Sequence, residues 1–176
     1  MDRKLPRILA AIIIPASLLA AAGFLLYSLW LRGAFLPGWI EWNRDVRETL
    51  PEELSEKLDP SWLLQDARSF DLTGNGNSEE VLLIWKRGSY GRRKPTWVKK
   101  NDTGFSQHIF IYELRDGEYH PIWMSSALDF EVASMSEGKL IPGTDHSGPG
   151  RKSLCLKSPD GTESFWGWLS WGLRRI

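Results

Sequence analysis

The sequence is poor in cysteine and histidine and carries no net charge, and each shortage excludes a class of protein. Cys155 is the single cysteine, so no disulfide can form within the chain. A disulfide-free domain outside the cell is less typical of a small secreted animal module than of a bacterial envelope protein. The 22 Lys and Arg residues balance the 22 Asp and Glu residues, which argues against nucleic acid as the main partner.

Recognisable catalytic motifs are also missing. The sequence holds no HExxH, no CxxC and no glycine-rich phosphate loop. Its three histidines are scattered, at His108, His120 and His146. The neighbours Asp145 and Ser147 do not make His146 part of a triad, because triad members meet through space from separate segments. We therefore expect a non-catalytic protein; the alternative is a membrane-anchored hydrolase or transferase, whose site would place a histidine beside a carboxylate in a cleft.

What the sequence has instead is a long uncharged run near its beginning. The 24 residues 8–31 carry no charge. A helix of this length spans roughly 36 Å, enough to cross a hydrocarbon core of about 30 Å. The run therefore predicts an uncleaved transmembrane helix. Two alternatives stay open: a signal peptide with its cleavage site at Ala20, Ala21 and Ala22, and a buried core helix.

Flanking charge sets the orientation expected for this helix. Arg3, Lys4 and Arg7 precede the run, whereas Arg32 alone follows it closely. Basic residues stay on the cytoplasmic side of a membrane. We therefore expect a single-pass protein of the cell membrane with three parts: a cytoplasmic tail at residues 1–7, a signal anchor in the lipid bilayer at 8–31, and an extracytoplasmic remainder.

Two further regions follow the uncharged run. In residues 32–60, apolar side chains recur every three or four positions, at Val46, Leu50, Leu54 and Leu58. This spacing predicts short juxtamembrane helices, either a stalk or helices packed on the following sheet. Residues 61–176 change to strand patterns and are long enough for a core of their own. Residues 33–176 carry 18 basic and 21 acidic side chains, so this part is slightly acidic.

Strand signals dominate residues 61–176. Apolar runs at 81–85 and 109–114 predict buried strands, and Asp116-Gly117 predicts a tight hairpin because this pair accepts positive φ angles. Glu137-Gly138 and Asp160-Gly161 predict further turns. Short strands without intervening helices favour an antiparallel sheet domain resembling propeller blades or a sandwich. The expected fold class is mainly β, with a single N-terminal transmembrane helix and short juxtamembrane helices before the sheet.

One loop pattern points to a metal. Calcium takes six to eight oxygen ligands in a flexible loop, with a glycine where the chain turns sharply. Oxygen-bearing side chains alternate before Gly76, and a carboxylate follows just before the strand at 81–85. The alternative is a metal-free turn in which the first aspartate accepts backbone hydrogen bonds. The pattern predicts calcium as a cofactor, with its ligands at Asp71, Thr73, Asn75, and Glu79 or Glu80.

Residues 70–87 resemble the calcium-loop repeats of the FG-GAP and VCBS class. These repeats run Asp-x-Asp/Thr-x-Asp/Asn-Gly-x-x-Asp/Glu and lead into an apolar strand. The resemblance implies a loop that joins two strands of a propeller blade, and a role in extracellular binding. The sequence holds one degenerate copy: Thr73 and Asn75 replace two acids, and one extra residue lies between Gly76 and the strand.

A basic segment follows the predicted strand. Residues 86–100 hold seven bases and no acid, with Tyr90 and Trp97 between them. Such a patch can hold an anionic envelope polymer or lipid headgroups, and aromatic faces can stack on sugars or cations. The alternative is a solvated hairpin loop whose side-chain stems cover apolar surface. The predicted ligand-binding residues are Lys86, Arg87, Arg92, Arg93, Lys94, Trp97, Lys99 and Lys100.

Aromatic residues gather near the carboxyl end. Alternation in a single strand at 164–173 places Trp166 and Trp168 on one face, and Leu169 and Trp171 on the other. A strand that is apolar on both faces is typically buried, and a sugar-stacking or partner-docking surface is the alternative. Together these patterns predict a membrane-anchored, extracytoplasmic, β-rich binding or accessory protein of the bacterial envelope. Its expected partner is an anionic envelope polymer or another membrane protein.

Overall fold

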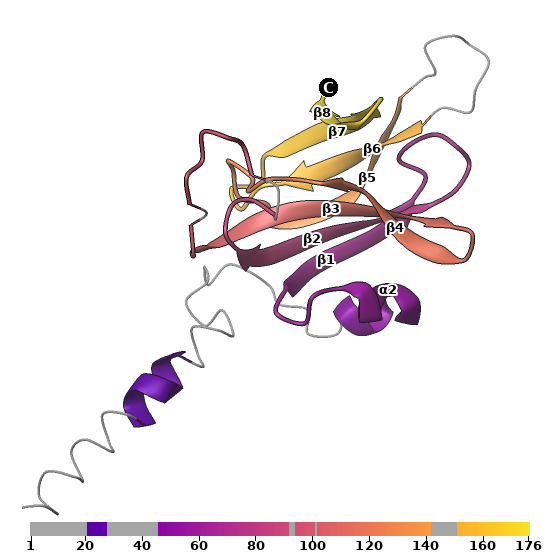
Figure 1. Ribbon diagram of the computed structural model, residues 1–176. Helices are drawn as coiled ribbons and strands as arrows, with labels where there is room; N and C mark the ends of the chain where they lie inside the picture. The colour runs from indigo at the N-terminus through magenta and orange to yellow at the C-terminus, as the bar shows by residue number, and fades with distance from the viewer. Residues whose placement is uncertain (1–20, 28–45, 92–93, 101, 142–150) are drawn as a thin grey trace, which may run out of the picture. The chain divides into compact units, whose positions relative to one another are not determined.

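The computed structural model describes residues 21–27, 46–91, 94–100, 102–141 and 151–176 (Figure 1). The chain divides into two compact units, residues 1–36 and residues 37–176. In the first unit, residues 21–27 form a helix. Its large apolar side chains are exposed, and Phe24 is the most exposed of them at 74%.

The prediction of a membrane-spanning helix is corrected by this finding. Among the described residues, no helix is long and apolar enough to cross a membrane. The single-pass topology and the localisation inferred from residues 8–31 are therefore not supported. The expectation took the whole uncharged run as one helix; residues 8–20 and 28–31 lie outside the described part.

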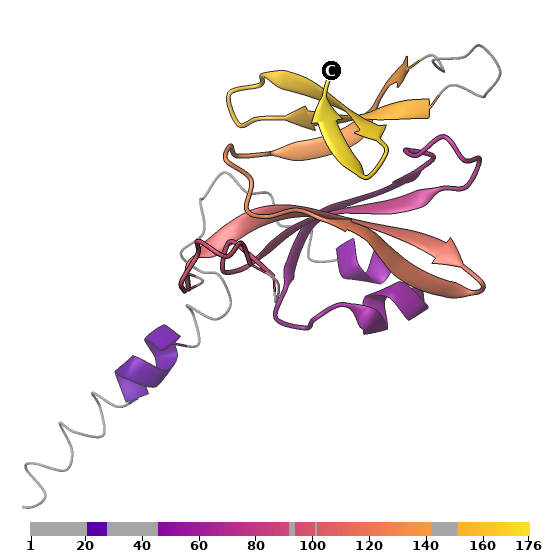
Figure 2. The same cartoon turned by 45° about the horizontal axis from the view of Figure 1, so that its top comes forward.

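The second unit holds two four-stranded antiparallel sheets, in which consecutive strands are neighbours. The first sheet comprises β1 (Leu63–Phe70), β2 (Glu79–Arg87), β3 (Phe105–Arg115) and β4 (Glu118–Met124). The second comprises β5 (Ser134–Ile141), β6 (Arg151–Lys157), β7 (Glu163–Leu169) and β8 (Gly172–Arg175). Two short helices, η1 (Val46–Thr49) and α2 (Glu52–Lys57), precede the strands. In Figure 2 the second sheet lies on one side of the first sheet and the helices on the other.

The first sheet is apolar on both faces because a layer covers each face. Alternate residues of β2 and β3 point to opposite sides, with Val81 paired with Ile111 and Leu82 with Phe110. One set packs against the second sheet, in a core with Leu154 and Leu156. The other set packs beneath the helices, against Val46, Leu50, Leu54 and Leu58. The predicted helical spacing therefore marks a packed helical layer and not a stalk.

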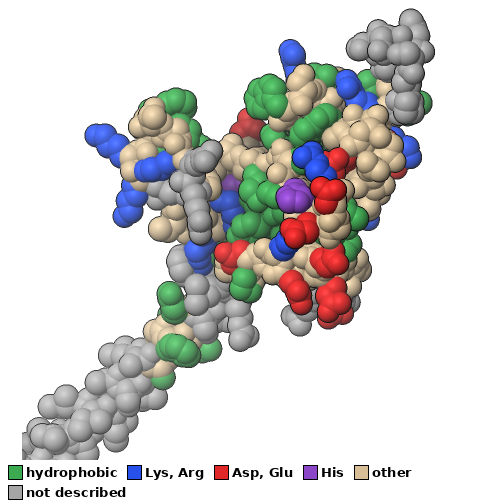
Figure 3. Space-filling view, turned by 45° about the vertical axis from the view of Figure 1, so that its right-hand side comes forward, with side chains coloured by type: hydrophobic (Ala, Val, Ile, Leu, Met, Phe, Trp, Pro, Cys, Tyr) green, Lys and Arg blue, Asp and Glu red, His purple; other side chains and the backbone are tan. Residues whose placement is uncertain are grey.

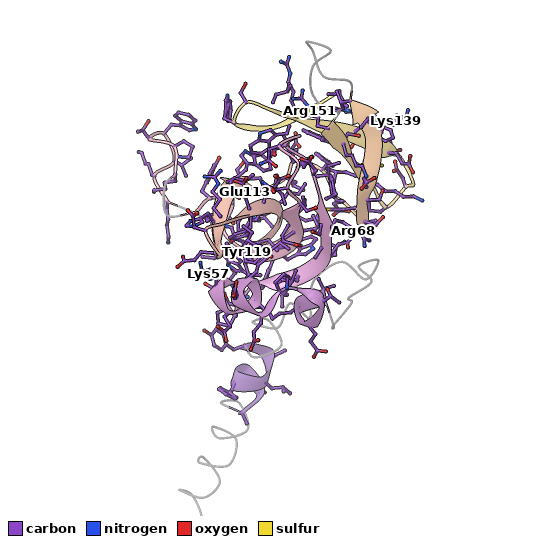
Figure 4. All side chains as sticks on the ribbon, turned by 90° about the vertical axis from the view of Figure 1, so that its right-hand side faces the viewer. Lys57, Arg68, Glu113, Tyr119, Lys139 and Arg151 are labelled. Atoms are coloured by element: carbon purple, nitrogen blue, oxygen red, sulfur yellow. The ribbon has the colours of Figure 1, made fainter. Side chains whose placement is uncertain are left out.

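Polar side chains fasten the helices and the second sheet to the first sheet. Lys57 of α2 donates to the Glu118 carboxylate and to the carbonyl oxygen of Tyr119, both at 3.2 Å, and Figure 4 shows Lys57 beside Tyr119. On the opposite side, β1 contacts β5 through the backbone of Met135. The Met135 N–H donates to Asp66 at 2.9 Å, and Arg68 donates to the Met135 carbonyl at 2.9 Å.

The mainly β, antiparallel part of the predicted fold is confirmed. The runs at 81–85 and 109–114 lie within β2 and β3. Asp116 and Gly117 turn the chain between β3 and β4 with φ angles of 52° and 80°, as the hairpin prediction requires. Asp160 and Gly161 likewise lie in the turn between β6 and β7.

Two predicted boundaries are wrong. Glu137-Gly138 is not a turn but part of β5, where the pairing with β6 slips between Glu137 and Leu140. A side chain at Gly138 would begin 2.5 Å from the Ser153 hydroxyl, so the glycine serves close packing. The predicted strand at 164–173 is two strands, because Ser170 adopts a φ of 54° and reverses the chain between β7 and β8.

The aromatic cluster divides between core and surface. Trp166 and Trp168 are half-buried and pack against the inter-sheet core. Trp166 also stacks on Phe130, with ring centroids 5.7 Å apart. Trp171 lies on the β7–β8 turn and is 81% exposed. Core packing, the favoured alternative, therefore applies to the first two tryptophans and not to the third.

Candidate functional site

Asp71 organises the loop between β1 and β2 from within. Its Oδ1 accepts hydrogen bonds from the N–H groups of Gly74 at 2.7 Å and Asn75 at 3.2 Å. Its Oδ2 accepts from the Gly76 N–H at 3.0 Å. Gly74 and Gly76 have φ angles of 81° and 87°, which glycine adopts without a steric penalty. These donors use three of the roughly four acceptor sites of a carboxylate.

Glu79 closes the same loop as a fully buried carboxylate, 0% exposed. Its Oε2 accepts from the N–H groups of Leu72 at 2.8 Å and Thr73 at 3.1 Å, and its Oε1 accepts from the Thr73 hydroxyl at 2.8 Å. Burial raises the pKa of Glu79, and the hydrogen bonds from Thr73 and Leu72 oppose that rise. The bonds compensate the loss of water around the carboxylate.

The loop also touches β3 and β6. The Asn75 side-chain amide donates to the buried Glu113 carboxylate of β3 at 2.8 Å. The Lys152 N–H of β6 donates to the Asp71 carbonyl at 3.3 Å. A side chain at Gly74 would begin 3.0 Å from Arg151 Cβ. The loop is therefore packed between the two sheets.

The structure brings four of the five predicted calcium ligands into one loop and separates the fifth. Glu80 points to the opposite face from Glu79, where it lines an open groove with Thr49 and Pro51. Burial raises the pKa of Glu80, and a hydrogen bond from Ser69 opposes this. In the described part of the chain, no group of three or more Asp, Glu, His or Cys side chains is placed to hold a metal ion.

The hydrogen bonds of the loop match the metal-free alternative. The carboxylates of Asp71 and Glu79 already accept six hydrogen bonds from donors of the loop itself. A calcium ion at this loop would have to share these oxygens with the backbone N–H groups. Calcium bound by Asp71, Thr73, Asn75 and Glu79 stays a prediction, as does the FG-GAP resemblance.

The basic segment comprises the end of β2 and most of the loop between β2 and β3, and Lys86 anchors its beginning. Lys86 is only 6% exposed. Its Nζ donates to the carbonyl oxygens of Gly88 at 2.6 Å and Tyr90 at 3.3 Å. Burial lowers the pKa of the ammonium group, and the negative charge of Asp102 opposes this. Lys86 therefore fastens the loop and does not face a ligand.

Other contacts close the stem of this loop, residues 86–90 and 102–105. The Arg87 guanidinium donates to the Thr103 carbonyl at 3.0 Å and lies 4.2 Å from the centre of the Phe105 ring. The Ser89 hydroxyl and N–H both donate to Asp102, at 2.5 and 3.1 Å. These bonds lower the pKa of Asp102. The Ser89 carbonyl accepts from the Ala127 N–H at 2.8 Å, which ties the stem to the segment after β4.

The remaining described residues of the basic segment form an exposed tip. Figure 3 shows Lys and Arg side chains along the projecting loop, apart from a gathering of Asp and Glu side chains elsewhere on the same face. Trp97 is 80% exposed. Arg92 and Arg93 lie outside the described residues. The tip is defined here as Lys94, Trp97, Lys99 and Lys100, all exposed.

A buried histidine lies beneath the stem and was not singled out by the sequence. His108 on β3 is 0% exposed. Its Nδ1 is 3.1 Å from the Ser125 carbonyl oxygen, which only accepts, so Nδ1 carries the hydrogen. Its Nε2 then accepts from the Ser106 hydroxyl at 2.8 Å. Ser106 and His108 are two apart on a strand, and this spacing was the available signal that they share a face.

The arrangement expected of a hydrolase or transferase is not found at the described histidines. The Ser106 hydroxyl and the Ser125 carbonyl hold His108, and no carboxylate of the described residues is a hydrogen-bond partner of its ring. Burial lowers the pKa of His108 to about 4, which makes its ring a weak base. His120 is exposed on β4, and His146 lies outside the described residues.

Comparisons with known proteins give no match: no family model and no curated protein matches the sequence, and no solved structure matches the fold. The fold defines a β-rich domain of two stacked four-stranded sheets. Its function must therefore be argued from its own surface.

Proposed function

We propose that this protein is a non-catalytic, β-rich binding protein whose β2–β3 loop holds an anionic polymer. The binding residues are those of the tip. One observation carries the proposal: Trp97 stands 80% exposed on a loop whose three described lysines around it are also exposed. Large aromatic side chains gain from burial, so a tryptophan this exposed favours a partner that covers it.

The charges of the tip support an anionic ligand. Among the described residues, no ion pair involves Lys94, Lys99 or Lys100. Lys94 donates to the backbone carbonyl oxygen of Lys99, which joins the two ends of the tip. Three exposed lysines within seven residues concentrate positive charge on this loop, and a bound anion would neutralise it. A polymer with repeated negative charges can contact all three lysines at once.

The rigid stem supports the same reading. Ser89 and Asp102, Arg87 and Thr103, and Gly88 and Gly104 are joined across the stem. A fixed base reduces the conformational entropy that the loop loses when it binds. The stem residues Lys86 and Arg87 act here as supports, so the binding role proposed for the basic segment rests with its tip.

The test compares two variants of the full chain that lose the same charge. Lys94→Ala/Lys99→Ala/Lys100→Ala removes the tip lysines, and Lys157→Ala/Arg174→Ala/Arg175→Ala removes three exposed bases of the second sheet. The probe is dextran sulfate, with neutral dextran as a blank. We expect the tip variant to bind at least tenfold more weakly and the control variant to bind like the parent. Both should keep their free energy of unfolding within about 0.5 kcal/mol, because exposed charges contribute little.

The contribution of Trp97 is measured separately. Trp97→Ala keeps every charge, and we expect it to weaken binding by about 1 kcal/mol or more, because a large aromatic side chain that is covered by a partner contributes strongly to binding. Equal weakening by the tip variant and the control variant would mean that net charge, and not this loop, attracts the polymer. Absence of binding by the parent at low salt would refute the proposed function.

A further inference from the structure

Two ionisable side chains lie side by side beneath the stem of the β2–β3 loop. Lys86 on β2 pairs with Ser106 on β3, and His108 is the next residue of β3 on the same face. Both side chains are buried, with exposures of 6% for Lys86 and 0% for His108. The neutral ring of His108 accepts a hydrogen bond from the Ser106 hydroxyl and donates one to the Ser125 carbonyl. A neutral ring beside a buried ammonium is stable, whereas two buried cations are not.

Lys86 connects this pair to the binding loop. Its Nζ holds the carbonyl oxygens of Gly88 and Tyr90. Gly88 has a φ of 79°, and its N–H donates to the Gly104 carbonyl across the stem at 2.9 Å. If Lys86 moves, the carbonyl oxygens of Gly88 and Tyr90 lose the hydrogen bonds that fix the path of the chain after β2.

We propose that protonation of His108 releases the stem of the β2–β3 loop, so that acidic pH opens the loop and weakens its hold on the ligand. The effect on ligand binding rests on the proposed function, whereas the opening of the stem does not depend on it. A proton on Nε2 would place a second positive charge beside Lys86 in a buried site. Opening of the stem admits water to both groups and relieves the repulsion.

Within the described part of the chain, no acidic side chain acts on the pKa of His108. Burial lowers the pKa of His108 most, the hydrogen bond to the Ser125 carbonyl opposes this, and the positive charge of Lys86 on β2 lowers the pKa further. The carbonyls of Ser126 and Gly88 act in the opposite direction. The segment after β4 contributes Ser125 and Ser126, which do not titrate. Asp102, on the exposed side of the stem, acts on Lys86. The helical layer contributes apolar side chains to this face.

The sign of the effect follows from the lowered pKa. The closed form holds His108 at a pKa of about 4, against about 6.5 for an exposed histidine. The closed stem is therefore favoured above pH 6.5 and loses that advantage as the pH falls towards 4. Linkage gives a rise of about 50-fold in the opening equilibrium between pH 7.0 and pH 4.5.

Hydrogen exchange of the full chain measures the opening directly. The amides of Gly88 and Ser89 are bonded across the stem to Gly104 and Asp102, and Leu154 in the inter-sheet core serves as the reference. After correction for intrinsic exchange, we expect protection at Gly88 and Ser89 to fall about 50-fold from pH 7.0 to pH 4.5, more than at Leu154. Equal loss at all three amides would mean general acid unfolding and would overturn the inference.

A matched variant isolates the histidine. Gln can donate to the Ser125 carbonyl and accept from Ser106 but does not titrate, so His108→Gln should keep the stem protected at pH 4.5. A stem that opens equally in this variant would overturn the inference. Should His108→Gln fail to fold, the comparison of stem and core amides in the parent still decides between the outcomes.

Binding of dextran sulfate is the second readout, because its sulfates stay charged across this range. Acidification neutralises carboxylates of the protein and would by itself strengthen binding to a polyanion. We expect the parent to bind more weakly at pH 4.5 than at pH 7.0, and His108→Gln to bind as tightly or more tightly. A stem that opens while the parent fails to bind at pH 7.0 would refute the proposed function and leave the opening intact.

Discussion

Single acidic residues hold the turns of this domain through backbone N–H groups. Asp59 accepts from the Ser61 N–H at 2.8 Å, Asp71 from Gly74 at 2.7 Å, and Asp160 from Thr162 at 2.9 Å. Hydrogen bonds from Ser61 lower the pKa of Asp59, and those from Thr162 lower the pKa of Asp160. Because aspartate accepts such hydrogen bonds in ordinary turns, a metal-free turn and a calcium loop have similar sequences.

Asp71→Ala separates these two roles of the loop. The substitution leaves three half-buried or exposed backbone N–H groups without their acceptor, so we expect about 1–2 kcal/mol of destabilisation. If Asp71 only stabilises the turn, the substitution lowers the free energy of unfolding by the same amount with saturating calcium and with a chelator. Urea unfolding of the parent and the variant in both solutions measures this. A loss that is clearly larger in calcium would instead make Asp71 a metal ligand, because binding to the folded state adds stability.

Part of the candidate site could be predicted from residue types, and part depended on strand register. The alternation of Asp71, Thr73 and Asn75 before Gly76 located the loop. The choice between Glu79 and Glu80 could not be made, because neighbouring residues of a strand face opposite sides and the pairing with β1 decides which faces the loop. The burial of Lys86 could not be predicted either, because a run of basic residues does not show where the strand ends.

At the scale of elements, the best predictions came from signals that act locally. Asp116-Gly117 determined a hairpin by itself, because its two residues accept the φ angles of the turn. The helical spacing of Leu54 and Leu58 was likewise sufficient to predict a short helix in this region. The break at Ser170 was missed because it needs a positive φ at a residue with no strong preference for one. Thr49 and Glu52 have capping-box spacing, yet the Thr49 hydroxyl donates to the Val46 carbonyl and Pro51 precedes α2 without a side-chain cap.

Leu54→Ala tests whether α2 belongs to the folded core. Leu54 is 0% exposed and packs with Leu82 and Phe110 of the first sheet. Truncation of a fully buried leucine costs about 2–5 kcal/mol. Leu140→Ala, at a side chain that is 62% exposed, is the control and should change stability by about 0.5 kcal/mol or less. Equal effects in urea unfolding would mean that the helical layer is not packed on the sheet.

At the scale of the whole molecule, the second unit is built of three layers, with helices, first sheet and second sheet in that order. The antiparallel arrangement could be predicted from the sequence, because the strands follow one another without helices between them. The sequence left open whether the strands form propeller blades or a sandwich of two stacked sheets, because the stacking depends on long-range contacts. Gln65 of β1 donates to the Val132 and Ala133 carbonyls at 3.0 and 2.8 Å, and Gln107 donates to Val132 at 2.7 Å. No local pattern predicts such a connection.

The central claim is that the tip of the β2–β3 loop binds polyanions, and the salt dependence of dextran sulfate binding tests it most directly. The logarithm of the binding constant is measured against the logarithm of salt concentration for the parent, the tip variant and the control variant. Each ion contact that releases a counterion contributes about 0.7 to this slope for a flexible polyanion such as a single nucleic-acid strand. We expect the slope to fall by roughly two for Lys94→Ala/Lys99→Ala/Lys100→Ala and to stay at the parent's value for Lys157→Ala/Arg174→Ala/Arg175→Ala. Identical slopes for the parent and the tip variant would contradict the account, because the three lysines would then make no contact with the polymer.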